Sequence, residues 1–344
     1  MKRQKILALL IIVGTMLLVT FSFYGYQAIY TPNVLVDDSD RVLLIPSGTT
    51  FDQVQDQLYD QHFVNDLLSF STLAKLMKYD RYVKPGRYLL RSNMSNIEAI
   101  RLLRSGEQTP VDVTFNNVRL KPELAERLCE NLEADKEQLL ALLNDQEFVA
   151  QYGFTTENIL TMFLPNTYEF YWTTSAEELF ERFHQEYQNF WSEQRLEKAN
   201  TLDMSPKDVG VLASIVESET NKPDEAPKVA GLYINRLQRN IALQADPTLV
   251  FAAGDFTIKR VLNKHKEIDS PYNTYKYTGL PPGPIRVPSI NAIDAVLNYE
   301  DHNYLYMCAR EDFSGYHNFA TNLNTHLANA RRYQRALSQA GIYN

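Results

Sequence analysis

The sequence has very few cysteines and no excess of basic residues. Cys129 and Cys308 are too few for a disulfide framework in 344 residues, and no spaced histidine pair beside them suggests a metal site. We expect buried free thiols, although an oxidising compartment leaves one bridge open. The formal net charge of −8 at pH 7 argues against nucleic acid as a partner, because phosphate binding needs a basic surface. Phosphate loops, nucleotide fingerprints and nucleophile elbows are also missing, so no cofactor is predicted.

One long uncharged run is present at the N-terminus, over residues 6–24. At about 1.5 Å per residue it comes close to spanning the roughly 30 Å hydrocarbon core of a bilayer. Basic residues precede the run and aspartates follow it, so we expect a cytoplasmic tail (residues 1–5), a spanning helix (6–26) and a periplasmic or extracytoplasmic remainder anchored in the cytoplasmic (inner) membrane. A cleaved signal peptide is the alternative, but residues 21–29 offer no small-x-small cleavage site.

The chain beyond the anchor is long enough for two domains, and its patterns predict an α+β protein. Residues 27–40 read as a polar linker, and residues 41–110 as a small first domain. Its expected order is β-α-α-β, with strands at 42–46 and 86–90, helices at 51–60 and 67–77, and a further helix at 95–105. This order, with the turn IPSGTT, resembles the LysM carbohydrate-binding module. Glycan binding and mere spacing or docking are both open for it.

Residues 111–344 are expected to form a larger, mixed α/β catalytic domain. Its predicted elements are a strand at 111–115, helical patterns at 122–144, an aromatic turn at 163–170, a long amphipathic helix at 175–198 and a final helix at 322–340.

The segment LASIVESET at residues 212–220 carries the candidate catalytic residue, Glu217. A serine cap and Pro206 predict that a helix begins near Pro206. On this helix Glu217 lies at the edge of an apolar face, beside three small residues that leave room for a substrate. Glu219 points elsewhere, toward apolar neighbours. The alternative is that both glutamates are ordinary members of an amphipathic helix.

Several motifs occur together in a characteristic order. They are FLPNTYEF at 163–170, LASIVESET at 212–220, INRL at 234–237, LQADPT at 243–248, YNTY at 272–275, GLPPGPI at 279–285 and HNFATN at 317–322. In this order they resemble the YceG-like family, and the resemblance covers essentially the whole chain.

The resemblance implies a lytic transglycosylase that cuts the β-1,4 bond between N-acetylmuramic acid and N-acetylglucosamine inside peptidoglycan strands, leaving a 1,6-anhydro end. It also implies a role in trimming or terminating nascent strands, with cell-wall synthases as partners. The family's catalytic glutamate falls on Glu217. The family's usual FPDTY reads LPNTY here, with Asn166 in place of aspartate, which puts any acidic role at that position in doubt.

One carboxyl group suffices for such a reaction, whereas ordinary glycosidases need two. Glu217 would protonate the glycosidic oxygen and then accept the proton of the substrate's C6 hydroxyl as that oxygen attacks C1. On this assignment Glu217→Gln folds but releases no anhydromuropeptides. The alternatives are a non-catalytic peptidoglycan-binding scaffold, or a hydrolytic muramidase with Asp246 or Glu219 as the second carboxylate.

Further polar and aromatic side chains are candidates for holding sugars. Amide, hydroxyl and imidazole groups could bind sugar hydroxyls or acetamido groups, and tyrosines could stack on pyranose rings. Asn and Asp beside proline also build turns for their own sake. The candidates are Asn235, Gln244, Asp246, Tyr272, Asn273, Thr274, Tyr275, His317 and Asn318.

Overall fold

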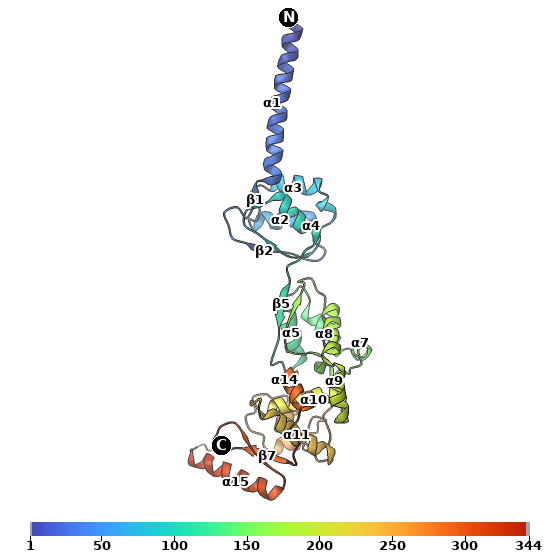
Figure 1. Ribbon diagram of the computed structural model, residues 1–344, viewed down its shortest axis with the longest axis vertical. Coiled ribbons are helices and arrows are strands. Elements are labelled where there is room, and N and C mark those ends of the chain that lie inside the picture. The colour runs from blue at the N-terminus through green and yellow to red at the C-terminus, as the bar shows by residue number, and fades with distance from the viewer. Residues whose placement is uncertain (1, 342–344) are drawn as a thin grey trace. The chain divides into compact units, whose positions relative to one another are not determined.

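The computed structural model describes residues 2–341 of the chain. The described residues form two compact units. The N-terminal unit runs to residue 112 and includes the short segments 131–133 and 169–174, and the C-terminal unit holds the rest. Helices predominate, and the strands of the described chain form four two-stranded sheets, so the architecture is mixed α+β (Figure 1).

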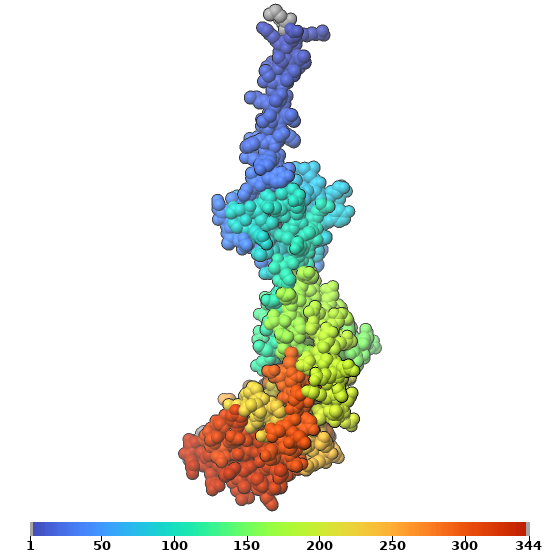
Figure 2. Space-filling model, viewed as in Figure 1, coloured from blue at the N-terminus to red at the C-terminus, as the bar shows by residue number. Residues whose placement is uncertain are grey.

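Helix α1 (Lys2–Tyr30) is an apolar rod with few neighbours. It is the one helix of the described chain that is long and apolar enough to cross a membrane. Its large apolar side chains from Ile6 to Tyr24 are exposed, and Figure 2 shows the helix standing out from the rest of the N-terminal unit. The helix extends a full turn past residue 26, where the sequence predicted a linker to begin.

The N-terminal unit is built around a hairpin-like pair of strands with two helices between them in sequence. Strands β2 (Arg41–Ile45) and β3 (Gly86–Leu90) pair antiparallel. Between them lie α2 (Phe51–Asp60), which begins at a Thr50–Gln53 capping box, α3 (Leu67–Leu76), capped by Asp66, and the 3-10 helix η1 (Tyr79–Arg81). Helix α4 (Asn96–Ser105) and the pair β1 (Pro32–Val34) and β4 (Met94–Ser95) complete the unit.

The expected spacer after the apolar helix is part of this unit. Val34 and Leu35 are fully buried in its core, against which Ile29 also packs. The side-chain amide of Asn96 donates to the Ala28 carbonyl at 2.8 Å and accepts from the Asn33 amide at 2.7 Å. Residues 31–40 are mostly polar, so nothing in the sequence indicated that Val34 and Leu35 belong to a core. Because of these contacts, α1 continues directly into a folded unit.

The C-terminal unit is mainly helical. Strand β5 (Val111–Thr114) pairs with β6 (Thr167–Phe170), and β7 (Tyr306–Ala309) pairs antiparallel with β8 (His317–Ala320). Cys129 and Cys308 are free thiols. The helices are α5 (Lys121–Cys129), α6 (Lys136–Asn144), α7 (Gln146–Gln151), η2 (Ile159–Met162), α8 (Ala176–Phe190), α9 (Glu193–Thr201), α10 (Pro206–Glu219), α11 (Ala226–Gln238), α12 (Asp246–Ala253), α13 (Asn263–Lys266), α14 (Ile290–Leu297) and α15 (Leu323–Gln339).

Two expectations for this unit were wrong. The helix predicted over 175–198 is two helices, because Trp191 turns into the core and Arg195 donates to the Phe190 carbonyl that ends α8. The aromatic segment predicted as a turn contains strand β6, in which Tyr168 and Phe170 are buried.

Helix α10 is the centre of the larger core. It begins at Pro206 behind a Ser205–Asp208 capping box, as the sequence predicted, and every residue from Val209 to Val216 is buried. It packs against α11, α12 and α14. Its first and last turns are only partly buried, and the last turn carries Glu217 and Glu219.

The network around Asn96 gives a test of how α1 joins its unit. We expect Asn96→Ala to lower the free energy of unfolding of the N-terminal unit by about 1–3 kcal/mol, because buried partners lose their hydrogen bonds. Urea denaturation of the detergent-solubilised chain measures this. Exposed Asn65→Ala is the control, and equal loss in both variants would contradict the expectation.

Candidate active site

The two glutamates at the end of α10 face different surroundings. The carboxylate of Glu219 accepts a hydrogen bond from the Tyr233 hydroxyl at 3.0 Å. The carboxylate of Glu217 accepts from the Ser289 amide at 2.9 Å, and its other oxygen lies 3.8 Å from the Arg286 guanidinium. Glu219 lines the two hollows described below, whereas Glu217 lines neither.

Protein atoms fill the space beside two of the small residues on the Glu217 side of α10. A Cβ on Gly210 would come within 3.0 Å of the Thr161 side chain, so η2 already occupies that space. The Ser214 hydroxyl accepts from the Ile285 amide at 3.1 Å. The proline-rich segment that ends near Ser289 therefore packs where the sequence left space for a substrate.

A groove with two hollows runs past Glu219. The hollows have volumes of about 380 and 720 Å³, and Glu219 and Asp246 line both of them. The first hollow is polar and aromatic, and the second mixes apolar side chains with charged groups. The first is lined further by Tyr233, Arg236, Gln244, Tyr275, Tyr306 and His317, and the second by Arg119, Phe251, Phe256, Lys259, Arg260 and Tyr333.

The surroundings of Glu219 favour its protonated form. Burial raises the pKa of its carboxyl from 4.5 to about 7, and the negative charge of Asp246 adds to this, while the hydrogen bond from Tyr233 opposes it. A carboxyl group with this pKa holds a proton for part of the time near neutral pH and can give it up or take it back. This is the property required of a general acid and base.

Two further side chains shape the floor of the first hollow. The Tyr275 hydroxyl donates to Asp246 at 2.5 Å, which places both predicted residues beside Glu219. Buried Arg236 donates to the carbonyls of Leu305, at 2.6 Å, and Leu243, at 2.9 Å. Its guanidinium also reaches the Gln244 side chain at 3.3 Å. Arg236 therefore joins the loop before α12 to the strand region before β7.

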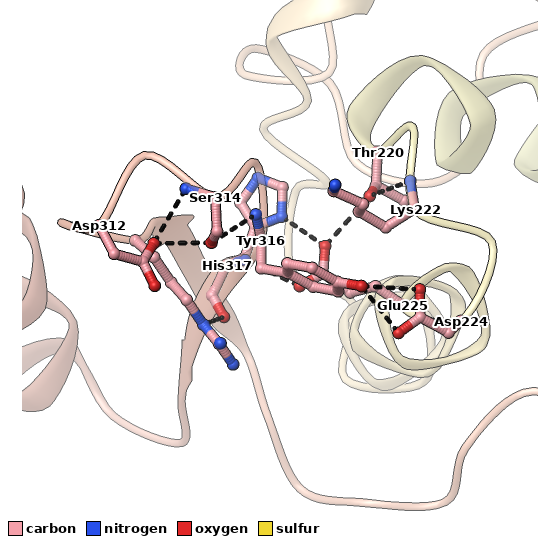
Figure 3. Close-up of polar contacts among 9 residues, drawn as sticks. Thr220, Lys222, Asp224, Glu225, Asp312, Ser314, Tyr316 and His317 are labelled. Carbon is pink, nitrogen blue, oxygen red and sulfur yellow. Dashed lines mark hydrogen bonds and ion pairs between the residues drawn. The ribbon is translucent and has the colours of Figure 1, made fainter.

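His317 is held at the wall of the first hollow by a buried carboxylate (Figure 3). Glu225 accepts from the His317 backbone amide at 2.7 Å, from its Nδ1 at 2.8 Å and from the Thr220 hydroxyl at 3.1 Å. Because Nδ1 faces the carboxylate, the ring's Nε2 edge is left for the groove. The Tyr316 hydroxyl binds Asp224 beside this pair, so the β7–β8 hairpin is fastened to the loop after α10.

The structure brings four of the nine expected sugar-binding residues to the first hollow: Gln244, Asp246, Tyr275 and His317. Asn235 instead donates to the carbonyls of His302 and Tyr304 at 2.7 and 3.1 Å. This amide holds a turn and does not line the groove.

The other expected residues also support loops. Asn273 is fully buried, donates to two backbone carbonyls and accepts from two amides. The Thr274 hydroxyl accepts from the Ala245 amide at 3.0 Å. Tyr272 packs on Phe251 with 4.7 Å between ring centres, and Asn318 donates to Glu311 at 2.8 Å. These contacts fix the groove's walls from behind.

Sequence reasoning undervalued Glu219, Tyr233, Arg236 and Glu225. Glu219 stands in the same motif as Glu217, and Arg236 follows Asn235, so both lie in segments that the motifs marked but at positions that were not chosen from the sequence. Glu225 carried no signal, because an acidic residue before a helix is normally a cap.

A groove with a protonatable carboxyl at its middle is typical of enzymes that cleave chain molecules such as glycans. The chain belongs to the YceG-like family, whose sequence pattern matches residues 43–332. It is 28% identical over 284 residues to the endolytic murein transglycosylase of Bacillus subtilis, covering 78% of each protein. It is 26% identical over 325 residues to that of Streptococcus pneumoniae D39, covering 83% of this chain and 58% of the streptococcal protein.

A solved structure is also similar. The crystal structure of a YceG-like protein from Listeria monocytogenes matches with a TM-score of 0.55 and 26% identity. The match covers 84% of this chain and 98% of the Listeria chain.

The raised pKa of Glu219 predicts how stability depends on pH. Folding raises this pKa from 4.5 to about 7, so stability is lost as the pH rises through that interval. We expect Glu219→Gln to stabilise the C-terminal unit by about 2–3 kcal/mol at pH 8 and to have no such effect near pH 4. Chemical denaturation at both pH values measures the difference.

Glu217→Gln is the matched control. Removing the charge beside Arg286 is expected to cost about 1 kcal/mol at pH 8. If Glu219→Gln had the same stability as the unchanged chain at pH 8, the burial of a charged Glu219 would be contradicted.

Proposed function

We propose that this chain is a membrane-anchored endolytic lytic transglycosylase of peptidoglycan, with Glu219 as its general acid and base. The observation that carries the proposal is the position of Glu219, a carboxyl with a pKa of about 7 in the middle of the groove. The names of the Bacillus and Streptococcus relatives supply the substrate and reaction type. Glu217, the residue chosen from sequence, is the competing candidate for the acid.

The proposed reaction needs one carboxyl group. Protonated Glu219 gives its proton to the glycosidic oxygen as the bond to C1 breaks, and the leaving sugar departs with a new hydroxyl. The resulting carboxylate is stabilised by the Tyr233 hydrogen bond. It then takes the proton from the C6 hydroxyl of N-acetylmuramic acid while that oxygen bonds to C1, which closes the anhydro ring without water.

The two hollows support cutting inside a strand. Sugars on either side of the broken bond need binding sites on either side of the acid, and Glu219 lies between hollows of about 380 and 720 Å³. Aromatic residues such as Tyr306 and Phe256 offer faces for pyranose rings.

The remaining parts of the proposal concern location and role. Helix α1 fits a single-pass anchor, and the basic residues before it favour a cytoplasmic N-terminus, with the chain after α1 outside the membrane. Trimming or terminating nascent strands and meeting cell-wall synthases stay predictions. The N-terminal unit has the β-α-α-β order of a LysM-like module, but Ser47 in its first turn is already bound to Glu133 at 2.6 and 2.8 Å. We therefore favour spacing or docking over glycan binding for this unit.

One observation favours hydrolysis as the second candidate. Asp246 lies near enough to Glu219 for its charge to raise the pKa of Glu219. In a muramidase this carboxylate would activate water, and the products would carry reducing ends. An anhydro product is lighter by one water, so mass spectrometry separates the two reactions.

Product analysis on isolated sacculi tests the assignment of the acid. We expect Glu219→Gln to lower the rate of release of anhydromuropeptides by between about 10² and 10⁴, and Glu217→Gln to keep it within about tenfold. The reverse order would return the role to Glu217. Reducing-end products that disappear in Asp246→Asn would establish the muramidase, and no products from the unchanged chain would leave a binding scaffold.

The pairing of His317 with Glu225 gives a separate test with defined glycan strands as substrate. If Nε2 of His317 binds a sugar group in both the ground state and the transition state, His317→Gln raises KM by up to about tenfold and changes kcat little. Glu225→Gln keeps two acceptor contacts and should act in the same direction, more weakly. A hundredfold loss of kcat at unchanged KM would instead assign His317 to proton transfer.

A further inference from the structure

We propose that the outer face of α3, together with the basic segment that follows it, docks on the lipid surface of the membrane that α1 spans. The proposal rests on the anchoring role of α1 but not on the chemistry of the groove. The N-terminal unit would then contact the membrane surface through α3 as well as being attached through α1.

The outer face of α3 is unusually apolar. The helix buries Phe70, Leu73 and Ala74 in its own unit, whereas Leu68 and Leu76 are 78% and 75% exposed. Outside α1, these are the most exposed large apolar side chains among the described residues. They lie about two turns apart on one face of α3. Exposing such a pair to water does not stabilise a soluble helix.

The join between α1 and its unit sets the depth of this face. At about 1.5 Å per residue, the hydrocarbon core of roughly 30 Å takes up residues 6 to about 25. Exposed Tyr24, Tyr26 and Tyr30 then lie at the interface, where aromatic residues are preferred. The unit is fixed to this last turn by Ile29 and by the Asn96 bond to Ala28, and α3 packs directly against α1 (Figure 1). Helix α3 therefore sits at headgroup depth.

The charges beside the two leucines favour lipid over a protein partner. Lys75 lies on α3, and Lys78 and Arg81 follow it, all exposed. None of the ion pairs formed among residues 2–341 includes them. The acidic neighbours are Asp66, which caps α3, and Asp80, which is partly buried. Leucines flanked by unpaired basic groups are typical of segments that lie in an anionic membrane interface.

Such a contact would be weak for a free segment, because only two leucines enter the interface. Attachment to α1 makes the contact intramolecular, so a high effective concentration holds it together. The same argument predicts that the contact is lost when the headgroups lose their negative charge or when the basic segment loses its positive charge.

Spin labels in the full chain test the proposal. Cys129 and Cys308 are replaced by alanine, and a nitroxide is attached to Leu68→Cys or Leu76→Cys after reconstitution in vesicles of phosphatidylcholine and phosphatidylglycerol. The lipid reference is Leu18→Cys on α1. The water reference is Leu44→Cys, an exposed leucine on β2, and Figure 1 shows this strand at the end of the unit away from α1. Power saturation compares accessibility to oxygen with accessibility to a water-soluble nickel chelate.

We expect labels at 68 and 76 to favour oxygen, between the values at 18 and 44, and to shift toward the value at 44 in pure phosphatidylcholine or with Lys75→Glu and Lys78→Glu. Water-like values at 68 and 76 with a lipid-like value at 18 would overturn the docking alone. A water-like value at 18 would remove the anchor on which it rests. Dipolar broadening that disappears on dilution with unlabelled chain would show a second copy on this face and would also overturn the proposal.

Discussion

The dense packing of α10 is the constraint on which the site depends. Its residues from Val209 to Val216 are buried against three other helices, so the helix cannot rotate or shift without opening the larger core. Its last turn is only partly buried. Because Glu217 and Glu219 are two residues apart, their side chains point to different sides of the helix. Glu217 therefore contacts a backbone amide and a guanidinium, whereas Glu219 lines the groove.

The electrostatics of Glu219 follow from the same packing. A carboxyl at the edge of an apolar core is poorly solvated, and the nearby Asp246 adds negative charge, so both effects favour the neutral form. Arg286 lies 3.8 Å from Glu217, whereas none of the ion pairs among the described residues includes Glu219. The neutral Tyr233 hydroxyl donates a hydrogen bond to Glu219, which stabilises the carboxylate without adding a positive charge. The two glutamates therefore have different electrostatic environments.

Local signals let the sequence predict much of the fold. Helix α2 and strand β3 lie where their patterns placed them, because a capping box and a glycine mark their ends within a few residues. The break at Trp191 could not be read in this way, since its cause is a tertiary one, the burial of an indole in a distant core. The preference for Glu217 over Glu219 likewise rested on local helix geometry alone. Helical geometry shows which small residues flank a carboxylate, but only the fold shows that Thr161 and Ile285 fill the space beside them.

The expected sugar ligands show a related limit. Asn273 and Gln244 look alike in a loop sequence, yet one is buried as a brace and the other lines the groove. Loops between the helices and strands complete the groove's walls, and a loop without a ladder must satisfy its backbone groups by other means. Asn273, Arg236 and Glu225 supply such partners from buried positions. Arg236 and Glu225 join segments far apart in sequence, whereas Asn273 fixes its own loop. A buried polar group is costly when any partner is lost, so these braces hold the walls in one arrangement. Of the nine residues expected to hold sugars, five support loops and four line the groove, and motif positions alone cannot tell the two kinds apart.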